Sequence, residues 1–517
     1  MKKIRILWTD DEVEVLKPHI MFLEEKGYEI DTCSNGNDTL DLVRQNRYDI
    51  IFLDEHMPGL SGIETLRQIR AVSTAIPVVM ITKSEEEEIM EAAIGLEVTD
   101  YLIKPIKPGQ ALPVIKKIID RKRLITGQNT TDYRHDFNRI SEMIASASSF
   151  TDWTEIYRRT VFWELELEKS ADPTMIEILK HQEHEAENLF SKFIINNYHG
   201  WLQPENTAKP ILSPELLPAK VFPHLKQGVP VFFLLIDNMR LDQWRAISAE
   251  LAGLYRTVEE DIYFSILPTA TQFCRNTIFA GLMPSAIAET MPCYWVDEEE
   301  EHGKNNFEEK MLEQHLLRRK IDIRWTYNKI HNSQEGKKVN EKLPVLLKND
   351  LNIMVFNFVD MLSHARTESG VIRDLATDEP AYRSLTRSWF LHSPLFELLR
   401  ILASRQVKII FSSDHGTVRV QTPVKIIGDR KTTMNLRYKT GKNLNYDPRK
   451  VFELREPHMA MLPKPNISSR YIFAINKDYF VYHNNFNHYA TYYRDTFQHG
   501  GVSMQEMMIP VACLQPI

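Results

Sequence analysis

The sequence contains few cysteines: Cys33, Cys274, Cys293 and Cys513 are the only four in 517 residues, and none forms a C-x-x-C pair. This scarcity argues against a disulfide framework or a thiolate metal site, and it suits reduced thiols in the cytoplasm. The first residues, MKKIRILWTDDE, lack the apolar core of a signal peptide. No stretch has the roughly 20 apolar residues that span a bilayer. We therefore expect a cytoplasmic protein without a membrane span.

An excess of positive charge is also missing, because 63 lysines and arginines face 70 aspartates and glutamates, for a net charge of -7. This balance argues against a bulk electrostatic attraction to nucleic acid and leaves only a local basic patch open. The share of apolar residues, 43%, is that of a globular protein. A chain of this length predicts two to four domains.

The pattern of apolar residues changes twice and predicts three segments. Residues 1–121 alternate five short apolar runs with amphipathic stretches, which is typical of a doubly wound five-stranded parallel sheet. Residues 122–205 have helical periodicity, few glycines, no strand-like run and no clear helix-turn-helix, and they predict an α-helical linker bundle. Residues 206–517 contain the runs VPVFFLLI, NIMVFNFV, VKIIF and MMIPVACL, which predict buried strands of an α/β domain.

Acidic residues follow two runs of the first segment, with Asp10 and Asp11 after the first and Asp54 after the third. The carboxyl ends of parallel strands meet in one crevice, where three carboxylates would repel one another unless a hard cation such as Mg²⁺ is bound. Thr82 and Lys104 end the fourth and fifth runs and are placed to contact a phosphoryl group there. Each aspartate alone is better explained as a helix N-cap, but five suitable residues at strand ends favour a site.

This arrangement and the turn MPGLSG after Asp54 resemble the receiver domain of two-component response regulators, which has a flavodoxin-like fold. The resemblance implies that a sensor histidine kinase phosphorylates Asp54 and that Asp10, Asp11 and Asp54 hold Mg²⁺. It also implies a change on the face between the fourth strand and the fifth helix, a face commonly used for homodimerisation. The receiver switch residues that it implies are Thr82, Tyr101 and Lys104.

Aspartates also follow three apolar runs of the last segment, and histidines stand near two of them and near the final run. The set consists of Asp237, Asp360, His364, Asp414, His415 and His499. Three carboxylates and three imidazoles are enough nitrogen and oxygen ligands for two cations such as Zn²⁺. Asp360 and His364 have the spacing of one helical face, and Gly416 allows a close backbone approach.

A hydroxyl completes this set. Thr269 and Thr271 follow the strand-like run IYFSIL, and we expect Pro268 and its turn to expose them. A threonine is a weak nucleophile unless a metal lowers its pKa or a base takes its proton, and two cations about 4 Å apart would activate it. Cys274 is a rival nucleophile. Any one of these short motifs arises easily by chance, whereas the ordered set does not.

The ordered set in LLIDNMRLDQW, PTATQFCRNTIFAGLMPS, VDMLSH, SDHG and HGG resembles the alkaline phosphatase superfamily, especially its nucleotide phosphodiesterase branch and PglZ domains. The resemblance implies an alkaline-phosphatase-like α/β fold with Thr271 as nucleophile. The implied ligands of one zinc ion are Asp237, Thr271, Asp414 and His415, and those of the other are Asp360, His364 and His499. Ile287 and Ala288 stand where many relatives carry His-Gly, so the details of substrate binding stay open.

The three segments together resemble the PorX-type response regulators of type IX secretion, which implies control of secretion through a sigma factor or a secretion component. Residues 419–450 hold nine lysines and arginines against two acidic residues, with Tyr438 and Tyr446 among them. This segment is interpreted either as a phosphate track with base stacking or as a solvated insertion.

Two functions follow from the whole pattern. The first is a zinc-dependent phosphodiesterase, or a related phosphatase, regulated by phosphorylation and acting on nucleotides or short cyclic or linear oligonucleotides. The second is a phosphorylation-switched scaffold whose metal site is mainly structural.

Overall fold

A computed structural model describes residues 4–72, 76–82, 98–106, 108–170, 172–203, 205–296, 303–428, 435–441, 443–464 and 469–517. Much of the receiver face expected to change on phosphorylation, and part of the basic segment 419–450, lie outside these residues. The chain divides into two compact units, Met1–Thr131 and Asp132–Ile517. Among the described helices, none has the length and apolar character needed to cross a membrane.

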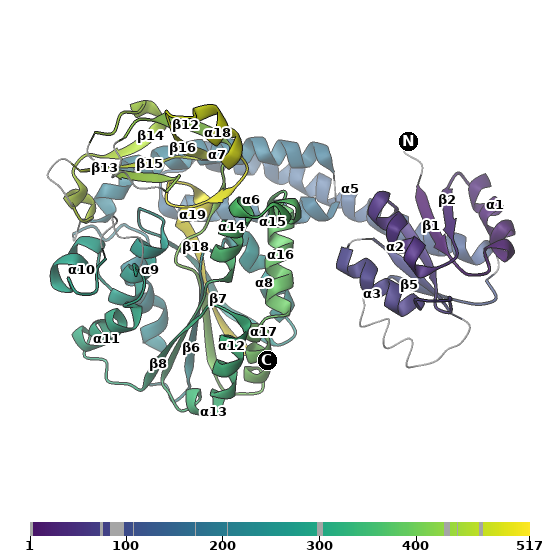
Figure 1. Cartoon of the computed structure of the whole chain (residues 1–517), viewed down its shortest axis with the longest axis horizontal. Coiled ribbons are helices and arrows are strands. Elements are labelled where there is room, and N and C mark those ends of the chain that lie inside the picture. The colour runs from purple at the N-terminus through teal and green to yellow at the C-terminus, as the bar shows by residue number, and fades with distance from the viewer. Residues whose placement is uncertain are drawn as a thin grey trace. The chain divides into compact units, whose positions relative to one another are not determined.

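The first unit is built on a five-stranded parallel sheet in the order β2-β1-β3-β4-β5 (Figure 1). Trp8 and Phe52 face one apolar cluster and Leu7 and Leu53 face the other, because successive side chains of a strand point to opposite faces. The predicted doubly wound sheet is confirmed. Its elements are β1 (Arg5–Thr9), η1 (Val13–Leu16), α1 (Lys17–Glu25), β2 (Glu29–Cys33), α2 (Gly36–Gln45), β3 (Ile50–Asp54), α3 (Gly62–Val72), β4 (Val78–Thr82) and β5 (Asp100–Ile103).

Three long helices form the predicted linker: α5 (Pro108–Ser146), α6 (Phe150–Ser170) and α7 (Pro173–Trp201). α5 begins in the first unit and runs without a break through the predicted boundary at residues 121 and 122. α7 begins where Asp172 caps the backbone N–H of Thr174 and Pro173 occupies the first helical position. Trp153, Tyr157 and Trp163 of α6 are buried, which agrees with a packing role for this aromatic stripe.

The second unit contains a six-stranded mixed sheet in the order β7-β18-β10-β6-β9-β8. Its strands are β6 (Val231–Ile236), β7 (Tyr255–Phe264), β8 (Trp325–Ile330), β9 (Leu351–Phe356), β10 (Lys408–Ser412) and β18 (Met508–Pro516). The strands β10, β6, β9 and β8 are parallel, whereas β18 pairs antiparallel with both β10 and β7. The predicted strand runs are therefore correct in place, except that the run 352–359 is a strand only to Phe356, and the last run is antiparallel to its neighbours.

Helices cover both faces of this sheet (Figure 1). α9 (Thr271–Ala280) and α11 (Glu308–Arg318) pack on the face that buries Phe233, whereas α8 (Leu241–Leu251), α17 (Pro394–Leu402) and the linker helices pack on the face that buries Leu234. The linker thus shares one apolar core with the α/β domain. This double cover explains why β6 is apolar at all six positions.

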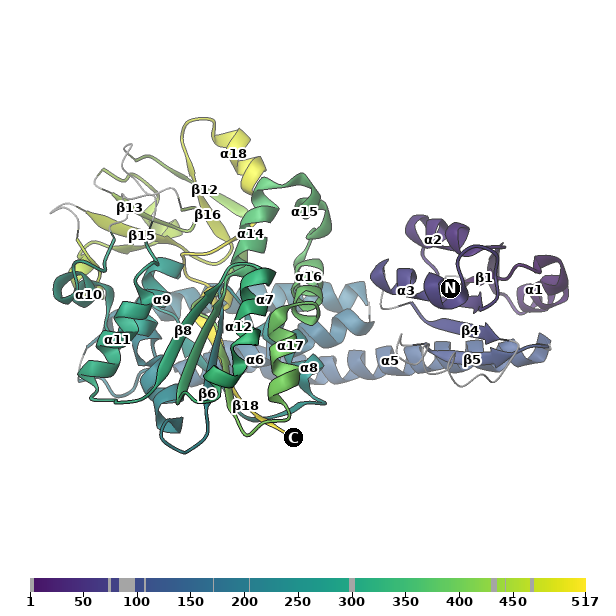
Figure 2. The same cartoon turned by 60° about the horizontal axis from the view of Figure 1, so that its bottom comes forward.

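The other elements form connections and a smaller β region above the carboxyl ends of the strands (Figure 2). The helices are η2 (Ser213–Glu215), η3 (Leu217–Val221), η4 (Phe222–His224), α10 (Pro284–Thr290), α12 (Ser333–Glu341), α13 (Leu343–Leu346), α14 (Phe358–Glu368), α15 (Gly370–Leu375), α16 (Glu379–Leu391), η5 (Pro448–Lys450), η6 (Pro457–Ala460), α18 (Phe486–Tyr493) and α19 (Met504–Met507). The strands are β11 (Val418–Arg419), β12 (Thr422–Ile426), β13 (Tyr438–Gly441), β14 (Val451–Leu454), β15 (Arg470–Ala474), β16 (Asp478–Tyr482) and β17 (Phe497–Gln498).

Candidate functional site

An acidic pocket lies at the carboxyl end of the receiver sheet. The parallel pairing of β1 with β3 brings Asp10 and Asp11 next to Asp54, and ligand atoms of the three lie within 4.8 Å of one another. Lys104 Nζ lies 2.8 Å from Asp10 Oδ2 and 3.0 Å from Asp54 Oδ2. Thr82 is buried at the end of β4, beside β3. The structure therefore brings the predicted acidic group and lysine together.

The charges of this pocket suit a hard cation. Burial raises the pKa of Asp54, the hydrogen bond from Lys104 opposes this, and the nearby Asp10 carboxylate adds to it. Within the described residues, Asp54 Oδ1 is buried and has no hydrogen-bond donor. An oxygen set of this kind fits Mg²⁺. Tyr101, the predicted switch aromatic, is half-buried on β5.

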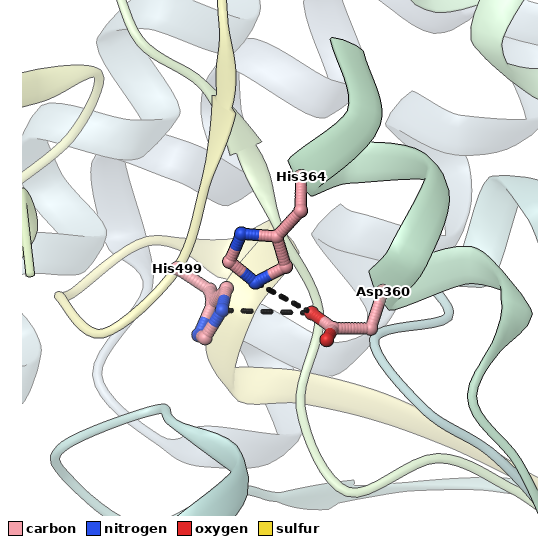
Figure 3. Close-up of side chains that lie close together, drawn as sticks. All are labelled: Asp360, His364 and His499. Atoms are coloured by element: carbon pink, nitrogen blue, oxygen red, sulfur yellow. Dashed lines mark ion pairs between the residues drawn. The ribbon is translucent and has the colours of Figure 1, made fainter. Parts of the chain in front are cut away.

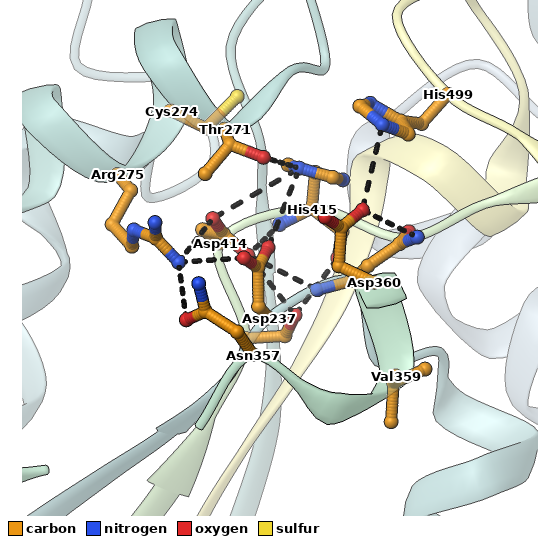
Figure 4. Close-up of polar contacts among 12 residues, drawn as sticks. Asp237, Thr271, Cys274, Arg275, Asn357, Val359, Asp360, Asp414, His415 and His499 are labelled. Atoms are coloured by element: carbon orange, nitrogen blue, oxygen red, sulfur yellow. Dashed lines mark hydrogen bonds and ion pairs between the residues drawn. The ribbon is translucent and has the colours of Figure 1, made fainter. Parts of the chain in front are cut away.

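A second acidic group lies at the carboxyl end of the larger sheet and consists of Asp237, Asp414 and His415. Asp237 follows β6, and the other two follow β10, which is the parallel neighbour of β6. All three side chains are buried. Thr271, the first residue of α9, places its Oγ1 3.1 Å from His415 Nε2 (Figure 4). We call this group with Thr271 the first cluster.

The second cluster consists of Asp360, His364 and His499, whose ligand atoms also lie within 4.8 Å of one another (Figure 3). Asp360 Oδ1 lies 3.6 Å from His364 Nε2 and 3.7 Å from His499 Nε2. The prediction that Asp360 ends a strand is wrong, because β9 stops at Phe356 and Asp360 lies in the first turn of α14. That turn is what aims Asp360 and His364 at the same point.

The two clusters are neighbours (Figure 4). The rings of His415 and His499 stack with centroids 4.4 Å apart. Asn238, in a left-handed backbone conformation, donates its backbone N–H to Asp414 Oδ1 and its side-chain amide to Asp360 Oδ1, each at 3.3 Å. The structure therefore brings all seven predicted zinc ligands to one end of the sheet. Their role as ligands remains a prediction.

The electrostatics of the two clusters suit bound cations. Burial, strengthened by repulsion from Asp237, raises the pKa of Asp414 well above its usual range and that of Asp360 to about 6. Burial lowers the pKa of His415 and His499. Within the described residues, Asp237 Oδ1 and Asp414 Oδ2 are buried without a hydrogen-bond donor. Divalent cations would stabilise these carboxylates in their charged form and bind neutral imidazoles.

The imidazoles are also oriented for this purpose. His415 Nδ1 lies 3.1 Å from the carbonyl oxygen of Gly416, and His499 Nδ1 lies 3.1 Å from that of Thr269. With Nδ1–H donating to these carbonyls, each Nε2 carries a lone pair that faces the clusters. The donor set therefore fits two divalent cations.

No sequence pattern indicated a role for Arg275, although the residue lies in the run PTATQFCRN. It stands one turn after Thr271 on α9, and its Nη1 lies 2.7 Å from Asp237 Oδ2. Its Nε donates to Glu308 at 2.5 Å, and Lys329 lies 3.1 Å from the same carboxylate. The spacing of four residues from Thr271 was the available signal, but no pattern indicated the partner Glu308 in a different helix.

Two expectations near Thr271 need correction or qualification. Thr269 is fully buried and donates to the carbonyl oxygen of Gly501, so the turn does not expose it. Cys274 is also fully buried, and its thiol donates to the carbonyl oxygen of Pro268 at 3.2 Å. Burial raises the pKa of Cys274 far above its usual value. A thiol kept protonated in this way is a poor nucleophile.

The basic segment 419–450 is not a continuous exposed track in its described part. Arg437 is buried against Glu506, and Tyr438 is buried against Phe273. Lys439 is buried with its ammonium 4.5 Å from the ring centroid of Tyr482. Of the two interpretations of this segment, base stacking is excluded for Tyr438, because the residue belongs to the core of the small β region.

Comparison with known protein families accounts for most of the chain. Residues 216–514 match the BREX system PglZ alkaline phosphatase-like domain, residues 123–202 the PorX response regulator linker domain, and residues 6–116 the response regulator receiver domain. The chain belongs to the PorX-type response regulators with a PglZ alkaline phosphatase-like domain.

Individual relatives match a shorter part of this PorX-type chain. The transcriptional regulatory protein ResD of Bacillus subtilis is 35% identical over 117 residues, which are 23% of this chain and 48% of ResD. The regulatory protein VanRB of Enterococcus faecalis is 33% identical over 118 residues, which are 23% of this chain and 53% of VanRB. The chain thus spans about half the length of these curated relatives.

Solved structures match a similar share of the chain. A two-component response regulator from Clostridium difficile is 30% identical, with a TM-score of 0.22, and the match covers 23% of this chain and 98% of that structure. The chemotaxis protein CheY4 of Vibrio cholerae is 25% identical, also with a TM-score of 0.22, and the match covers 23% of this chain and 99% of that structure.

Proposed function

We propose that this PorX-type regulator carries a zinc-dependent phosphodiesterase in its PglZ domain and that phosphorylation of the receiver controls it. The observation that carries the proposal is the position of Thr271, whose Oγ1 lies 3.1 Å from His415 Nε2 in the first cluster, with the second cluster stacked against the same histidine. A hydroxyl beside two adjacent cation-binding groups suits phosphoryl transfer through an enzyme-bound intermediate.

The two clusters and Thr271 have different roles in the proposed reaction. Zinc ions would be held by the two clusters and would supply charge stabilisation for the oxygens around phosphorus. The Thr271 hydroxyl gives its proton to solvent, and Oγ1 forms a bond to phosphorus while the bond to the leaving nucleoside oxygen breaks and that oxygen takes a proton from water. Water then loses a proton to solvent and attacks phosphorus, the bond from phosphorus to Thr271 Oγ1 breaks, and Thr271 regains its proton. Because Thr271 begins α9, the positive end of the helix dipole also faces the phosphate.

The substrate class and the regulatory context belong to the same proposal. The proposed substrates are nucleotides or short cyclic or linear oligonucleotides. The proposed phosphorylation site is Asp54, with Mg²⁺ held by Asp10, Asp11 and Asp54. We propose that phosphorylation produces a homodimer, which acts on type IX secretion through a sigma factor or a secretion component. The domain limits 1–121, 122–205 and 206–517, and the switch roles of Thr82, Tyr101 and Lys104, are part of the proposal.

The test is hydrolysis by the full chain in the presence of Zn²⁺, with a chromogenic phosphodiester, cyclic dinucleotides, linear oligonucleotides and monoesters as substrates. Thr271→Val removes the hydroxyl at nearly constant volume and should abolish turnover, whereas Thr271→Ser should keep part of it and Cys274→Ala should keep most of it. Unchanged hydrolysis by Thr271→Val would reject the nucleophile. Lack of hydrolysis of every ester by the wild type would reject the enzyme and favour the scaffold.

A further inference from the structure

α18 carries aromatic rings on its surface close to the second cluster. Its sequence FNHYATYY places rings at helical spacing, so that Tyr489 stacks with Tyr493 at 6.0 Å and His488 stacks with Tyr492 at 6.3 Å. Tyr489 and Tyr492 expose 40% and 37% of their surface, and His488 is exposed as well. Tyr493 is partly buried and packs against an apolar cluster with Tyr479, which anchors the helix.

Direct contacts join this helix to the candidate site. The Tyr492 hydroxyl donates to the carbonyl oxygen of Thr367 on α14 at 3.1 Å, and the Gln498 amide donates to Thr367 Oγ1 at 3.4 Å. Thr367 lies three residues after His364, which is a rise of about 5 Å along the helix. Gln498 directly precedes His499. Tyr492 therefore contacts the helix that supplies His364, and Gln498 joins that helix to the segment that supplies His499.

Positive charge accompanies these rings. The guanidinium of Arg373 lies 5.4 Å from the ring centroid of Tyr492, and Arg494 at the end of α18 is exposed. Arg419, in an ion pair of 3.1 Å with Asp495, lies in the neighbouring strand β11. Exposed rings beside guanidinium groups are the two components with which proteins bind single-stranded nucleic acid.

We propose that α18 is a stacking platform for the bases of a single-stranded oligonucleotide whose phosphate lies at the metal clusters. The proposal rests on the proposed phosphodiesterase function and adds the residues that favour a chain of several bases over a simple diester. Stacking on an exposed ring accepts any base, so the platform selects for length rather than sequence. Tyr489 is the best residue for a test, because its ring is exposed on α18 and the proposal assigns no role to its hydroxyl.

The experiment measures binding apart from turnover. Fluorescence anisotropy of a labelled tetra-adenylate is recorded with the full chain carrying Thr271→Val, and Tyr489→Ala, Tyr489→Phe and Thr491→Ala are each added to it. Loss of one stacked base predicts that Tyr489→Ala weakens binding roughly 5- to 150-fold. Tyr489→Phe keeps the ring and Thr491→Ala changes an exposed residue of the same helix, so both should bind like the parent. In the otherwise wild-type chain, Tyr489→Ala should leave hydrolysis of the chromogenic diester unchanged.

The outcomes separate the platform from the enzyme. Equal affinity of Tyr489→Ala and its parent, or no binding of the oligonucleotide by the parent, overturns the platform even if the wild type hydrolyses diesters. Equal losses of oligonucleotide binding and of chromogenic hydrolysis also overturn it, because they indicate a structural role. A binding loss specific to Tyr489→Ala supports the platform even if the wild type hydrolyses nothing, a result that rejects the proposed function alone.

Discussion

Arg275 and Asp237 form a buried ion pair inside the first cluster, with Arg275 Nη1 2.7 Å from Asp237 Oδ2. The same guanidinium donates to Glu308 on its other side, and both partners are buried. A carboxylate of the first cluster is thereby held in place by a guanidinium group of the protein. We therefore expect Arg275 to position Asp237 and to compensate its charge.

Replacing Arg275 by methionine should destabilise the metal-free protein strongly. The substitution leaves the carboxylates of Asp237 and Glu308 buried without their partner, which typically costs about 3–5 kcal/mol. Zn²⁺ should restore more stability to the variant than to the wild type, because it replaces the lost charge beside Asp237. Denaturant unfolding with chelator and with Zn²⁺ measures both effects.

The matched control is Arg245→Met, which breaks the more exposed pair of Arg245 with Glu260 and should cost about 1 kcal/mol or less. Equal losses of stability in the two variants, or an equal response of both to Zn²⁺, would show that Arg275 has no specific role in the site.

Phosphorylation of the receiver should depend on Asp54 and on Mg²⁺. Lys104 contacts both Asp10 and Asp54, and a bound cation adds the charge needed to bring in an anionic phosphoryl donor. We expect Asp54→Asn to abolish phosphorylation by acetyl phosphate and Asp10→Asn to reduce it, as followed by intact mass. Asp41→Asn, an exposed change in α2, should react normally. Full phosphorylation of Asp54→Asn would place the modification elsewhere.

We expect Glu187, where the linker helix α7 contacts α19, to make the stability of the folded protein dependent on pH. It lies buried on α7 and accepts the backbone N–H of Met504 at 3.2 Å. Burial raises its pKa to about 7, an effect that the Met504 N–H and Lys477 oppose and Glu506 reinforces. Since the folded pKa lies above the unfolded value, this stability is present at low pH and is lost as pH rises from about 4.5 through 7.

We therefore expect Glu187→Gln to gain up to about 3 kcal/mol of stability over the wild type between pH 5 and pH 8. Urea unfolding at a series of pH values measures the difference. Glu185→Gln, an exposed change on the same helix, should follow the wild type. If Glu187→Gln instead follows the wild-type pH profile, Glu187 is charged at neutral pH and its burial has no such effect.

The strand pattern was sufficient to predict where the carboxylates meet. Asp237 and Asp414 follow apolar runs that are typical of buried parallel strands, and neighbouring strands of one sheet end together. The pairing of Arg275 with Glu308 could not be predicted from the sequence, because it depends on the packing of α9 against α11. The burial of Tyr438 could not be predicted either. A tyrosine in a basic segment has the same sequence pattern whether a second strand covers it or not.

Helix starts were the other source of error. The run 352–359 is apolar except at Asn352 and Asn357, but the chain turns at Asn357 and begins α14, which moves Asp360 from a strand end to a helix. Periodicity cannot separate a strand from a following buried helical turn over so few residues.

The most direct test of the account is the zinc content of the purified full chain after dialysis, measured by plasma mass spectrometry. The wild type should hold two zinc ions per chain, and the double variant His364→Ala and His499→Ala, which dismantles the second cluster, should hold one. Less than one tightly bound transition-metal ion in the wild type, or two in the double variant, would contradict the central claim.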